Sequence, residues 1–268
     1  MEANPETPRL HIEVRGEGPL LVWAHGFGGS ARNFRPQWRR FSERFRCVIY
    51  DARGHARSDA PPNAHDYSIA LLCEDLGRVL DATDPAPAFV GGLSLGAATA
   101  LAFARARPER IRGLILASYP ASRGAGPGGF SRVARAFADR LDADGLEAAG
   151  SEFVWGPSSG LDARGADLVR QGFLEHPPHA MAHMLRGVVH ALPTPEDLAE
   201  ALRAKPLPLP VLLIAGAEDA GSLAASRTLA DALPSAELVV VPEAGHVVNL
   251  QAPAAFDAAV EAFLAREG

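Results

Sequence analysis

A serine set between glycines is the residue of this chain best suited to nucleophilic chemistry. The pattern G-x-S-x-G occurs at Gly92-Leu93-Ser94-Leu95-Gly96 and again at 156–160, around Ser158. Ser94 follows an apolar, strand-like run and precedes an Ala- and Leu-rich helical run, whereas Ser158 lies among Pro and Gly with no strand before it. Small flanking residues permit the sharp strand-to-helix turn that exposes a serine hydroxyl. We therefore predict Ser94 as a nucleophile and interpret Ser158 as a loop residue.

A serine hydroxyl is a weak nucleophile and needs a neighbouring base that an acid orients. His246 is the best candidate base, because a short turn separates it from the apolar run at 238–241 and so places it at the carboxyl end of a strand. Two carboxylates, Glu218 and Asp219, follow the apolar run at 211–215. We prefer Asp219 as the orienting acid and keep Glu218 as the alternative. Serine, acid and histidine then follow one another in the order expected for a triad on successive strand ends.

Acyl transfer also requires hydrogen-bond donors for the oxyanion of the intermediate. The backbone N–H of Leu95 meets this need because it opens the helix after Ser94, at the positive end of the helix dipole. We predict the second donor at Phe27, in the glycine-rich loop His25-Gly26-Phe27-Gly28-Gly29-Ser30 that follows the first central strand. We interpret His25, in the same loop, as a structural residue that fixes the loop by hydrogen bonding rather than as a base.

The order of apolar and amphipathic runs predicts the scaffold that positions these residues. Non-alternating apolar runs, typical of strands buried on both faces, lie at 20–24, 47–50, 88–90, 113–117, 211–215 and 238–241. Helical patterns lie at 68–83, 95–107, 222–233 and 253–266. This alternation predicts an α/β fold, with a mostly parallel sheet and helices on both of its faces. The alternating residues 10–15 add an amphipathic edge strand.

The alternation stops between Tyr119 and Pro210, where no strand-like run occurs. Helical spacing appears there at 130–141, 163–174 and 179–192, between stretches rich in Gly and Pro. We interpret the whole chain, 1–268, as a single domain with a helical cap inserted at about residues 120–205. Aromatic and Met side chains of the cap can line an apolar pocket. The predicted substrate contacts among them are Trp155, Phe130 and Met184.

Composition disfavours several other kinds of chemistry. Of the 26 basic residues one is Lys, and Lys205 lies beside Pro206 and Pro208, a poor place for the desolvated amine of a Schiff base. A net charge of −6 without a basic block disfavours nucleic-acid binding. Cys47 and Cys73 lack metal-ligand spacing, and we interpret them as two buried free thiols in a reducing compartment.

The chain also lacks the segments that would direct it to a membrane. No apolar run approaches the ~20 residues of a membrane span, and the first nine residues lack the apolar core of a signal peptide. We expect a cytoplasmic protein that acts on a small-molecule substrate and needs no cofactor, metal, nucleic acid or membrane. Its oligomeric state stays open.

Two polar clusters outside the triad are interpreted as structural. The first has the spacing of metal ligands and consists of His176, His179 and His183. No carboxylate or cysteine obviously completes a ligand set, so we assign these histidines to packing. The second cluster consists of Arg53, Arg57 and Asp59, which we interpret as ion-pair residues, with binding of an acidic substrate as the alternative.

Together these motifs resemble the α/β-hydrolase superfamily. The resemblance rests on HGFGGS at 25–30, DARGHARSD at 51–59, GLSLG at 92–96, GAED at 216–219 and GH at 245–246. It implies a Ser94 nucleophile, a His246 base, an Asp219 acid, and oxyanion donors at Phe27 and Leu95. Ala56 stands where the family usually has Gly, which questions the local loop geometry.

The resemblance implies an enzyme class more firmly than a substrate. Family members include carboxylesterases, enol-lactonases, C–C bond hydrolases and a menaquinone-pathway synthase, whereas dehalogenases and epoxide hydrolases have Asp in place of Ser94. We expect hydrolysis of a carboxylic ester or lactone of a small, apolar substrate. The alternatives are C–C bond cleavage or a lyase or synthase reaction on the same scaffold, and a ligand receptor that keeps the triad.

Overall fold

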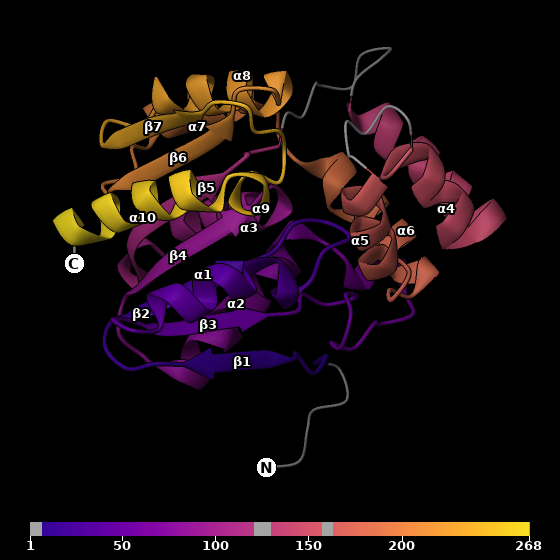
Figure 1. Cartoon of the computed structure of the whole chain (residues 1–268), viewed down its shortest axis with the longest axis horizontal. Coiled ribbons are helices and arrows are strands. Elements are labelled where there is room, and N and C mark those ends of the chain that lie inside the picture. Colours follow the sequence, from indigo (N-terminus) through magenta and orange to yellow (C-terminus); the bar gives the residue numbers. More distant parts are fainter. Residues whose placement is uncertain (1–6, 121–129, 157–162, 268) are drawn as a thin grey trace.

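One sheet runs through the protein (Figure 1). In the computed structural model, which describes residues 7–120, 130–156 and 163–267, it has seven strands in the order β1-β3-β2-β4-β5-β6-β7. The strands are β1 (Ile12–Arg15), β2 (Leu20–Ala24), β3 (Arg46–Tyr50), β4 (Ala88–Leu93), β5 (Ile111–Ala117), β6 (Val211–Gly216) and β7 (Ala236–Val241). Strand β1 runs antiparallel to β3, and the neighbouring pairs from β3 to β7 are parallel. The predicted α/β fold with a mostly parallel sheet is confirmed.

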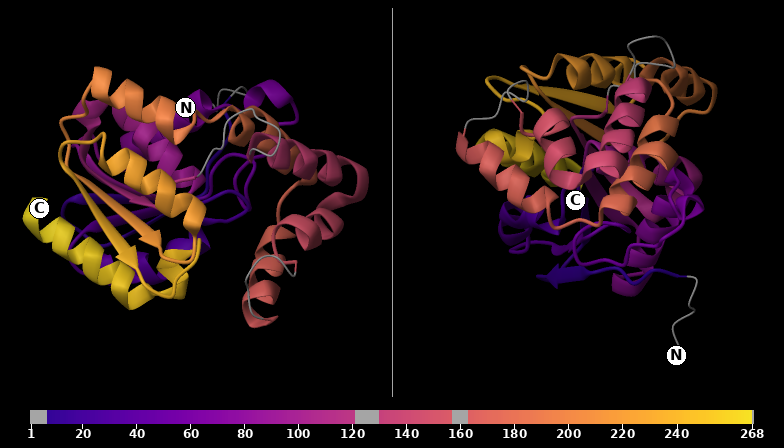
Figure 2. Two further views of the ribbon diagram at one scale, coloured as in Figure 1. Left: turned by 90° about the horizontal axis from the view of Figure 1, so that it is seen from above. Right: turned by 90° about the vertical axis from the view of Figure 1, so that its right-hand side faces the viewer.

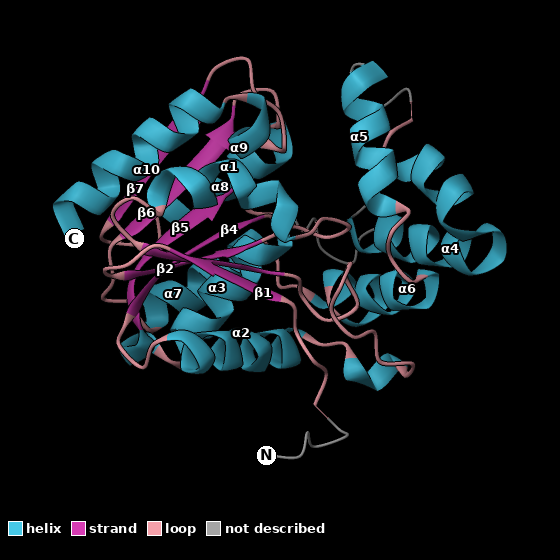
Figure 3. Cartoon of the chain, turned by 60° about the horizontal axis from the view of Figure 1, so that its bottom comes forward, coloured by secondary structure: helices cyan, strands magenta, loops and turns pink. Residues whose placement is uncertain are grey.

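Helices cover both faces of this sheet (Figure 3). In β2, Val22 belongs to the core on one face and Trp23 to the core on the other, as the two-residue period of a strand requires. The first face packs against α2 (Ile69–Thr83), α3 (Leu95–Ala106), α7 (Pro195–Ala204) and α8 (Ala220–Ala230). The second face packs against α1 (Arg35–Phe41), α9 (Val248–Gln251) and α10 (Pro253–Glu267). Because both faces are buried, the central strands need apolar side chains at every position.

A helical segment separates β5 from β6 in the chain. It contains α4 (Phe130–Phe153), α5 (Ala163–Phe173) and α6 (Pro178–Gly187), and α7 leads back to the sheet. Short 3-10 helices lie at Ala31–Phe34, Ala64–Asp66, Pro108–Arg110 and Val189–Ala191. Figures 1 and 2 show α4, α5 and α6 beside the sheet, at the side toward which the parallel strands point. These helices therefore lie where the carboxyl ends of the strands are.

Helices α1, α7 and α9 are additions to the set predicted from the sequence. Helix α1 spans 7 residues, too few for a helical period to stand out. Helix α7 carries a start signal, because Thr194 accepts a hydrogen bond from the N–H of Asp197 and Pro195 occupies the first turn. The helix predicted at 130–141 continues to Phe153 through a break at Gly145, where φ is +77°.

The two cysteines are free thiols, as predicted. Cys47 is buried and Cys73 is half-buried, and burial raises the pKa of each to about 12. Both thiols are therefore protonated at neutral pH and poor nucleophiles. In the described part of the chain, none of the helices has the length and apolar character needed to cross a bilayer.

Candidate active site

Ser94 occupies the turn between β4 and α3 in a strained backbone conformation. Its φ of +52° and ψ of −112° lie in a region that side chains other than Gly rarely adopt. The turn is held by a hydrogen bond of 2.9 Å from the N–H of Ser94 to the carbonyl of Ala117 on β5. The N–H of Ala98 in turn donates to the carbonyl of Ser94 at 2.9 Å, which starts the helix. The sequence around Ser94 thus forms the predicted strand-to-helix turn.

The two glycines of GLSLG are required by close backbone approach. A Cβ added at Gly96 would overlap the carbonyl oxygen of Ala24, at the end of β2. A Cβ added at Gly92 would overlap the backbone of Gly96 itself. Any larger residue would therefore push helix α3 away from the sheet and displace Ser94.

Asp219 and His246 meet at the same edge of the sheet as Ser94. Asp219 follows β6, His246 follows β7, and the imidazole Nδ1 lies 2.6 Å from the carboxylate Oδ2 of Asp219. The other carboxylate oxygen accepts the backbone N–H of Ser222 at 3.1 Å, so Asp219 also caps α8. The neighbouring Glu218 is exposed. Of the two predicted acids, Asp219 is therefore the one that the structure joins to the histidine.

The carboxylate of Asp219 is ionised at neutral pH. Partial burial works to raise its pKa, but hydrogen bonds from His246 and Ser222 outweigh burial and lower the pKa to about 2. Since an ionised carboxylate can only accept, Nδ1 of His246 must carry a hydrogen and donate it. The second ring nitrogen, Nε2, is then left with a lone pair that can take a proton. The half-exposed imidazole is thus arranged as a base.

Ser94 and His246 share this edge without a hydrogen bond between them. Backbone bonds tie the strand ends together, from Ser118 to Ile214 at 2.8 Å and from Ala217 to Val241 at 2.9 Å. Among the described residues, the structure joins His246 to Asp219 but forms no hydrogen bond from Ser94 to His246.

The loop after β2 packs directly on Ser94. A Cβ added at Gly26 would lie 3.5 Å from the Cβ of Ser94. Within the described residues, the N–H groups of Phe27 and Leu95 have no acceptor, and both remain available to a ligand. His25 fixes this loop, because Nδ1 donates to the carbonyl of Gly26 at 2.8 Å and Nε2 accepts the N–H of Ala52 at 2.9 Å. The structural interpretation of His25 is confirmed.

Two further buried histidines, His55 and His176, link the loop after β2 to the helical segment. His55 accepts the N–H of Gly28 at 3.2 Å, and its ring lies 4.9 Å from that of His25. His176, which follows α5, lies 5.2 Å from the ring of His55 and accepts the N–H of Ala56 at 2.9 Å. Burial lowers the pKa of all three histidines, to about 4 in His176. The cluster of His25, His55 and His176 is therefore neutral at pH 7.

Ala56, which stands where the family usually has Gly, adopts a backbone conformation typical of Gly. Its φ is +43°, in the left-handed region where Gly is the usual residue. The loop therefore keeps a conformation that suits Gly, and Ala56 carries strain of about 1 kcal/mol there. The hydrogen bond of its N–H to His176 holds the backbone in that conformation.

The His176→Gln variant should be less sensitive to acid than the wild type. The pKa of His176 in the folded protein, about 4, is below the ordinary value of 6.5, so the unfolded chain binds more protons in that window and folding stability is lost as pH falls from 6.5 toward 4. Gln keeps an acceptor for Ala56 and does not titrate. The loss in free energy of unfolding between about pH 7.5 and about pH 4.5, measured by urea denaturation, should shrink by about 2 kcal/mol.

His65 provides the control for this measurement, because its side chain is 81% exposed. His65→Gln should leave the acid-induced loss in free energy of unfolding unchanged. If His176→Gln loses as much free energy of unfolding at low pH as the wild type, His176 is not a source of the pH dependence of stability.

Ion pairs hold the loop at 51–59. Arg53 pairs with Asp75 at 2.6 Å, and both side chains are buried. Arg57 pairs with Asp51 at 2.8 Å, and Asp59 pairs with an N-terminal arginine. The structural interpretation of Arg53, Arg57 and Asp59 is confirmed.

The other predicted histidines make separate contacts. Nε2 of His183 lies 3.2 Å from the carbonyl of Pro62, and the rings of His179 and His183 are 6.0 Å apart. The described residues contain no group of three His, Cys, Asp or Glu that could hold a metal ion.

Aromatic side chains of the helical segment pack on the residues beside Ser94. The ring of Phe27 lies 5.8 Å from Phe137 and 6.3 Å from Phe173, and Trp155 lies 5.8 Å from Phe173. Leu95 belongs to the same apolar cluster. The side chain of Phe27 therefore packs against α4 and α5, and Leu95 belongs to the apolar cluster that these helices help to form.

The predicted substrate contacts fall in different surroundings. Trp155 is partly exposed at the aromatic cluster, and Met184 is fully buried inside it. The side chain of Phe130, at the first residue of α4, lies outside the described residues, as does Ser158 of the second G-x-S-x-G pattern.

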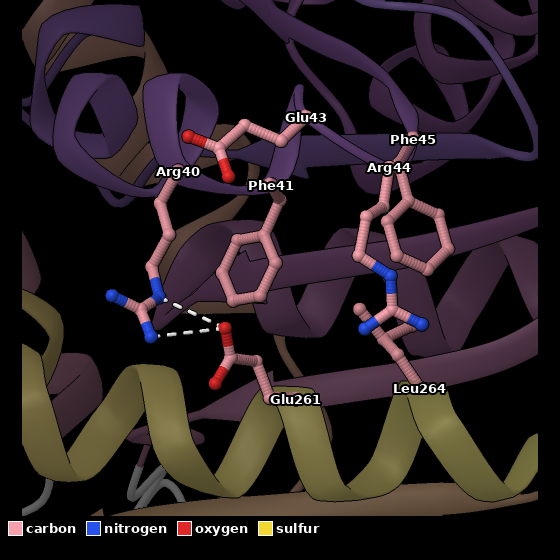
Figure 4. Close-up of a pocket in the computed structure, with 7 residues that line it drawn as sticks. All are labelled: Arg40, Phe41, Glu43, Arg44, Phe45, Glu261 and Leu264. Atoms are coloured by element: carbon pink, nitrogen blue, oxygen red, sulfur yellow. Dashed lines mark hydrogen bonds and ion pairs between the residues drawn. The ribbon is translucent and has the colours of Figure 1, made fainter.

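A surface groove elsewhere in the molecule is unrelated to this site (Figure 4). It runs between α1 and α10, and an ion pair of 2.9 Å between Arg40 and Glu261 crosses it. Phe45, which lines the groove, immediately precedes β3. The groove therefore lies toward the amino ends of the strands, opposite the edge that carries Ser94.

Sequence motifs missed one residue that the structure places at the site. The buried hydroxyl of Ser222 lies 3.3 Å from Nδ1 of His246. The only sequence signal was its position three residues after Asp219, where a helix start places a residue over the N-cap side chain.

Known proteins resemble the chain over almost its whole length. The profile of the Alpha/beta hydrolase family matches residues 21–259. A protein of Bacillus subtilis (strain 168), provisionally named as a 2-succinyl-6-hydroxy-2,4-cyclohexadiene-1-carboxylate synthase, is 31% identical over 95% of this chain and 95% of its own. A protein of Caulobacter sp. (strain K31), provisionally named as the carbamate hydrolase RutD, is 32% identical over 96% of each chain. The structure of the enol-lactonase from Burkholderia xenovorans LB400 is similar with a TM-score of 0.82, at 27% identity over 96% of each chain. The chain thus belongs to the alpha/beta hydrolase family.

Proposed function

We propose that the protein is a serine hydrolase that cleaves a carboxylic ester or lactone of a small, apolar substrate. Ser94 is the nucleophile, His246 the general base and Asp219 the acid that orients it. The observation that carries this proposal is the 2.6 Å bond from His246 to an ionised Asp219, at the strand edge where Ser94 is held in a strained turn. Strain of this kind is characteristic of active sites.

The mechanism uses protein groups and water. Nε2 of His246 takes the proton of Ser94 as Oγ attacks the carbonyl carbon, and the N–H groups of Phe27 and Leu95 stabilise the oxyanion. His246 then gives its proton to the leaving oxygen, and the acyl group stays on Ser94. Water, deprotonated by His246, releases the acid product and restores the serine.

The helical segment is proposed to be a cap over this site, and the whole chain a single domain. Phe27 packs against aromatic residues of α4 and α5, and Leu95 belongs to the same apolar cluster, so the segment can supply apolar walls for a substrate. Trp155, Phe130 and Met184 are the proposed substrate-binding side chains, of which Met184 is fully buried in the structure. An apolar acyl group or lactone ring suits such walls. With two free thiols, the enzyme is proposed to act in the cytoplasm.

A synthase reaction on the same scaffold is the second candidate, because one relative carries that name. The named compound bears succinyl and carboxylate groups, and recognition of two carboxylates calls for cationic side chains. Three arginines of α4, α5 and α6, namely Arg140, Arg170 and Arg186, pair with carboxylates of the segment, whereas Arg135 contacts His190 at 3.1 Å. The apolar surroundings of Leu95 therefore favour the ester or lactone.

A fluorophosphonate label and a substrate panel test the proposed function. We expect the label to attach to the peptide that contains Ser94, as read by mass spectrometry. We also expect p-nitrophenyl esters and lactones to be hydrolysed, with kcat/KM rising with acyl chain length until the apolar pocket is filled. Labelling at another residue, or none, would contradict the nucleophile. Labelling at Ser94 with negligible turnover of every ester and lactone would favour the synthase or C–C bond reaction.

A further inference from the structure

Ser222 lies against the bond between Asp219 and His246. Its hydroxyl oxygen is 3.3 Å from Nδ1 of His246, and its backbone N–H donates to Oδ1 of Asp219 at 3.1 Å. Ser222 is 2% exposed, whereas 47% of the His246 side chain is exposed. Ser222 therefore closes the side of the Asp219–His246 pair that faces the protein.

Among the described residues, the hydroxyl of Ser222 has one hydrogen-bonding partner, Nδ1 of His246. The Nδ1–H of His246 already points to Oδ2 of Asp219 at 2.6 Å, so the hydroxyl oxygen is a second, weaker acceptor for it. The Ser222 side chain is also one of the groups that overcome burial and lower the pKa of the Asp219 carboxylate. The hydroxyl thus contacts His246 and helps to keep Asp219 ionised, and both of these residues belong to the candidate active site.

Helix capping accounts for the backbone of Ser222 but not for its side chain. Asp219 caps α8 through the N–H at this position, which any residue except Pro supplies. A buried hydroxyl costs free energy unless it is hydrogen-bonded. Ser226, one turn further along α8, gives the contrast, because it is fully buried and its hydroxyl has no partner among the described residues.

We propose that Ser222 is a positioning residue: its hydroxyl fixes Asp219 and His246 in the one mutual orientation that presents Nε2 of the imidazole to the nucleophile. This inference rests on the proposed function, because it assigns Ser222 a part in presenting the base. Within the described residues His246 forms an ion pair with Asp219 alone, and Glu218 and Glu243 on the adjoining turns are exposed. Ser222 therefore acts through these two side chains.

The Ser222→Ala variant removes the hydroxyl and keeps the backbone donor to Asp219. Without the hydroxyl, which helps to lower the pKa of Asp219, the carboxylate attracts the protonated imidazole more strongly, and the imidazole is less well oriented. We expect kcat on a p-nitrophenyl ester to fall about tenfold, with KM little changed. We also expect the acid limb of the kcat profile to move to higher pH by about half a unit.

Two matched variants separate positioning from packing. Ser222→Thr keeps the hydroxyl and should restore both kcat and the pH profile. Ser226→Ala removes a buried hydroxyl of the same helix and should change neither. Ser222→Cys, which keeps the volume and weakens the donor, gives the same comparison if Ser222→Ala does not fold.

A proton NMR spectrum of the folded protein supplies a readout without substrate. The Nδ1 hydrogen between His246 and Asp219 should give a low-field resonance that is absent in His246→Gln. In Ser222→Ala this resonance should shift and exchange faster with water, and in Ser226→Ala it should not.

The proposal is overturned if Ser222→Ala keeps the wild-type kcat, pH profile and resonance, or lowers only the melting temperature. It is equally overturned if Ser226→Ala causes the same changes as Ser222→Ala. Failure of the proposed function gives a different result, because the fluorophosphonate then does not label Ser94 in the wild type. The Nδ1 resonance still reports in that case whether Ser222 orders Asp219 and His246.

Discussion

Replacing Ser94 with Ala should lower kcat for ester hydrolysis by about 10⁶-fold while the protein stays folded. The hydroxyl of Ser94 forms the covalent bond to the acyl group, so the acyl-enzyme route ends with its removal. The N–H groups of Phe27 and Leu95 are backbone donors and survive the substitution. Residual hydrolysis of about 10³- to 10⁴-fold above the uncatalysed rate is therefore expected. Steady-state kinetics together with near-UV circular dichroism measure both properties.

Ser158→Ala is the matched control for this experiment. It removes the serine of the second G-x-S-x-G pattern, which no strand precedes in the sequence. We expect this variant to keep wild-type kcat and KM. Near-wild-type turnover by Ser94→Ala, or an equal loss in Ser158→Ala, would remove Ser94 from its proposed role.

Replacing Asp219 with Asn should lower kcat by about 10⁴-fold. The structure dictates how the amide must lie, because the N–H of Ser222 already donates to Oδ1 of residue 219. The amide oxygen keeps that bond, and the NH₂ group then faces His246. Since Nδ1 of His246 would have to accept, the ring hydrogen moves to Nε2, where it blocks proton transfer from Ser94.

The decrease in kcat caused by Asp219→Asn should persist at every pH above about 4. The pKa of Asp219 is lowered to about 2 from an ordinary value of 3.8, so the wild-type carboxylate is ionised throughout this range and loses its negative charge only as pH falls through 2. Raising the pH therefore cannot restore the variant. The kcat profile from about pH 5 to about pH 9 measures this.

Glu218→Gln tests the alternative acid in the same assay. Glu218 is exposed, and we expect its substitution to change kcat by less than about twofold. A large loss in Glu218→Gln with little loss in Asp219→Asn would reverse the assignment of the acid.

The residues at the strand ends were predictable because each depends on a local pattern. Apolar runs locate β4, β6 and β7, and the residue just past each run falls at the common carboxyl edge of a parallel sheet. Together with the G-x-S-x-G pattern and the chain order of serine, acid and histidine, these placements were enough to predict Ser94, Asp219 and His246. The glycines beside Ser94 added a local reason, since the turn has no room for a Cβ.

Long-range packing determines what the sequence did not reveal. His176 is 120 residues from Ala56 in the chain, and nothing near either residue indicates that they share a hydrogen bond. Ser222 was hidden for another reason, because a serine in the first turn of a helix is ordinary there. Its relation to His246 exists only once β6 and β7 lie side by side. Helix α1 was missed because 7 residues show no clear period.

Phe27 joins two tasks in one residue, and this constrains how the enzyme can evolve. Its backbone N–H is the proposed oxyanion donor, while its ring packs on Phe137 and Phe173 of the helical segment. A substitution that reshapes those aromatic neighbours to admit a new substrate also moves the peptide that stabilises the intermediate. Selection for a different substrate therefore also changes the turnover of the original substrate. Substitutions that change substrate specificity without loss of turnover should therefore occur at residues that do not contact Phe27.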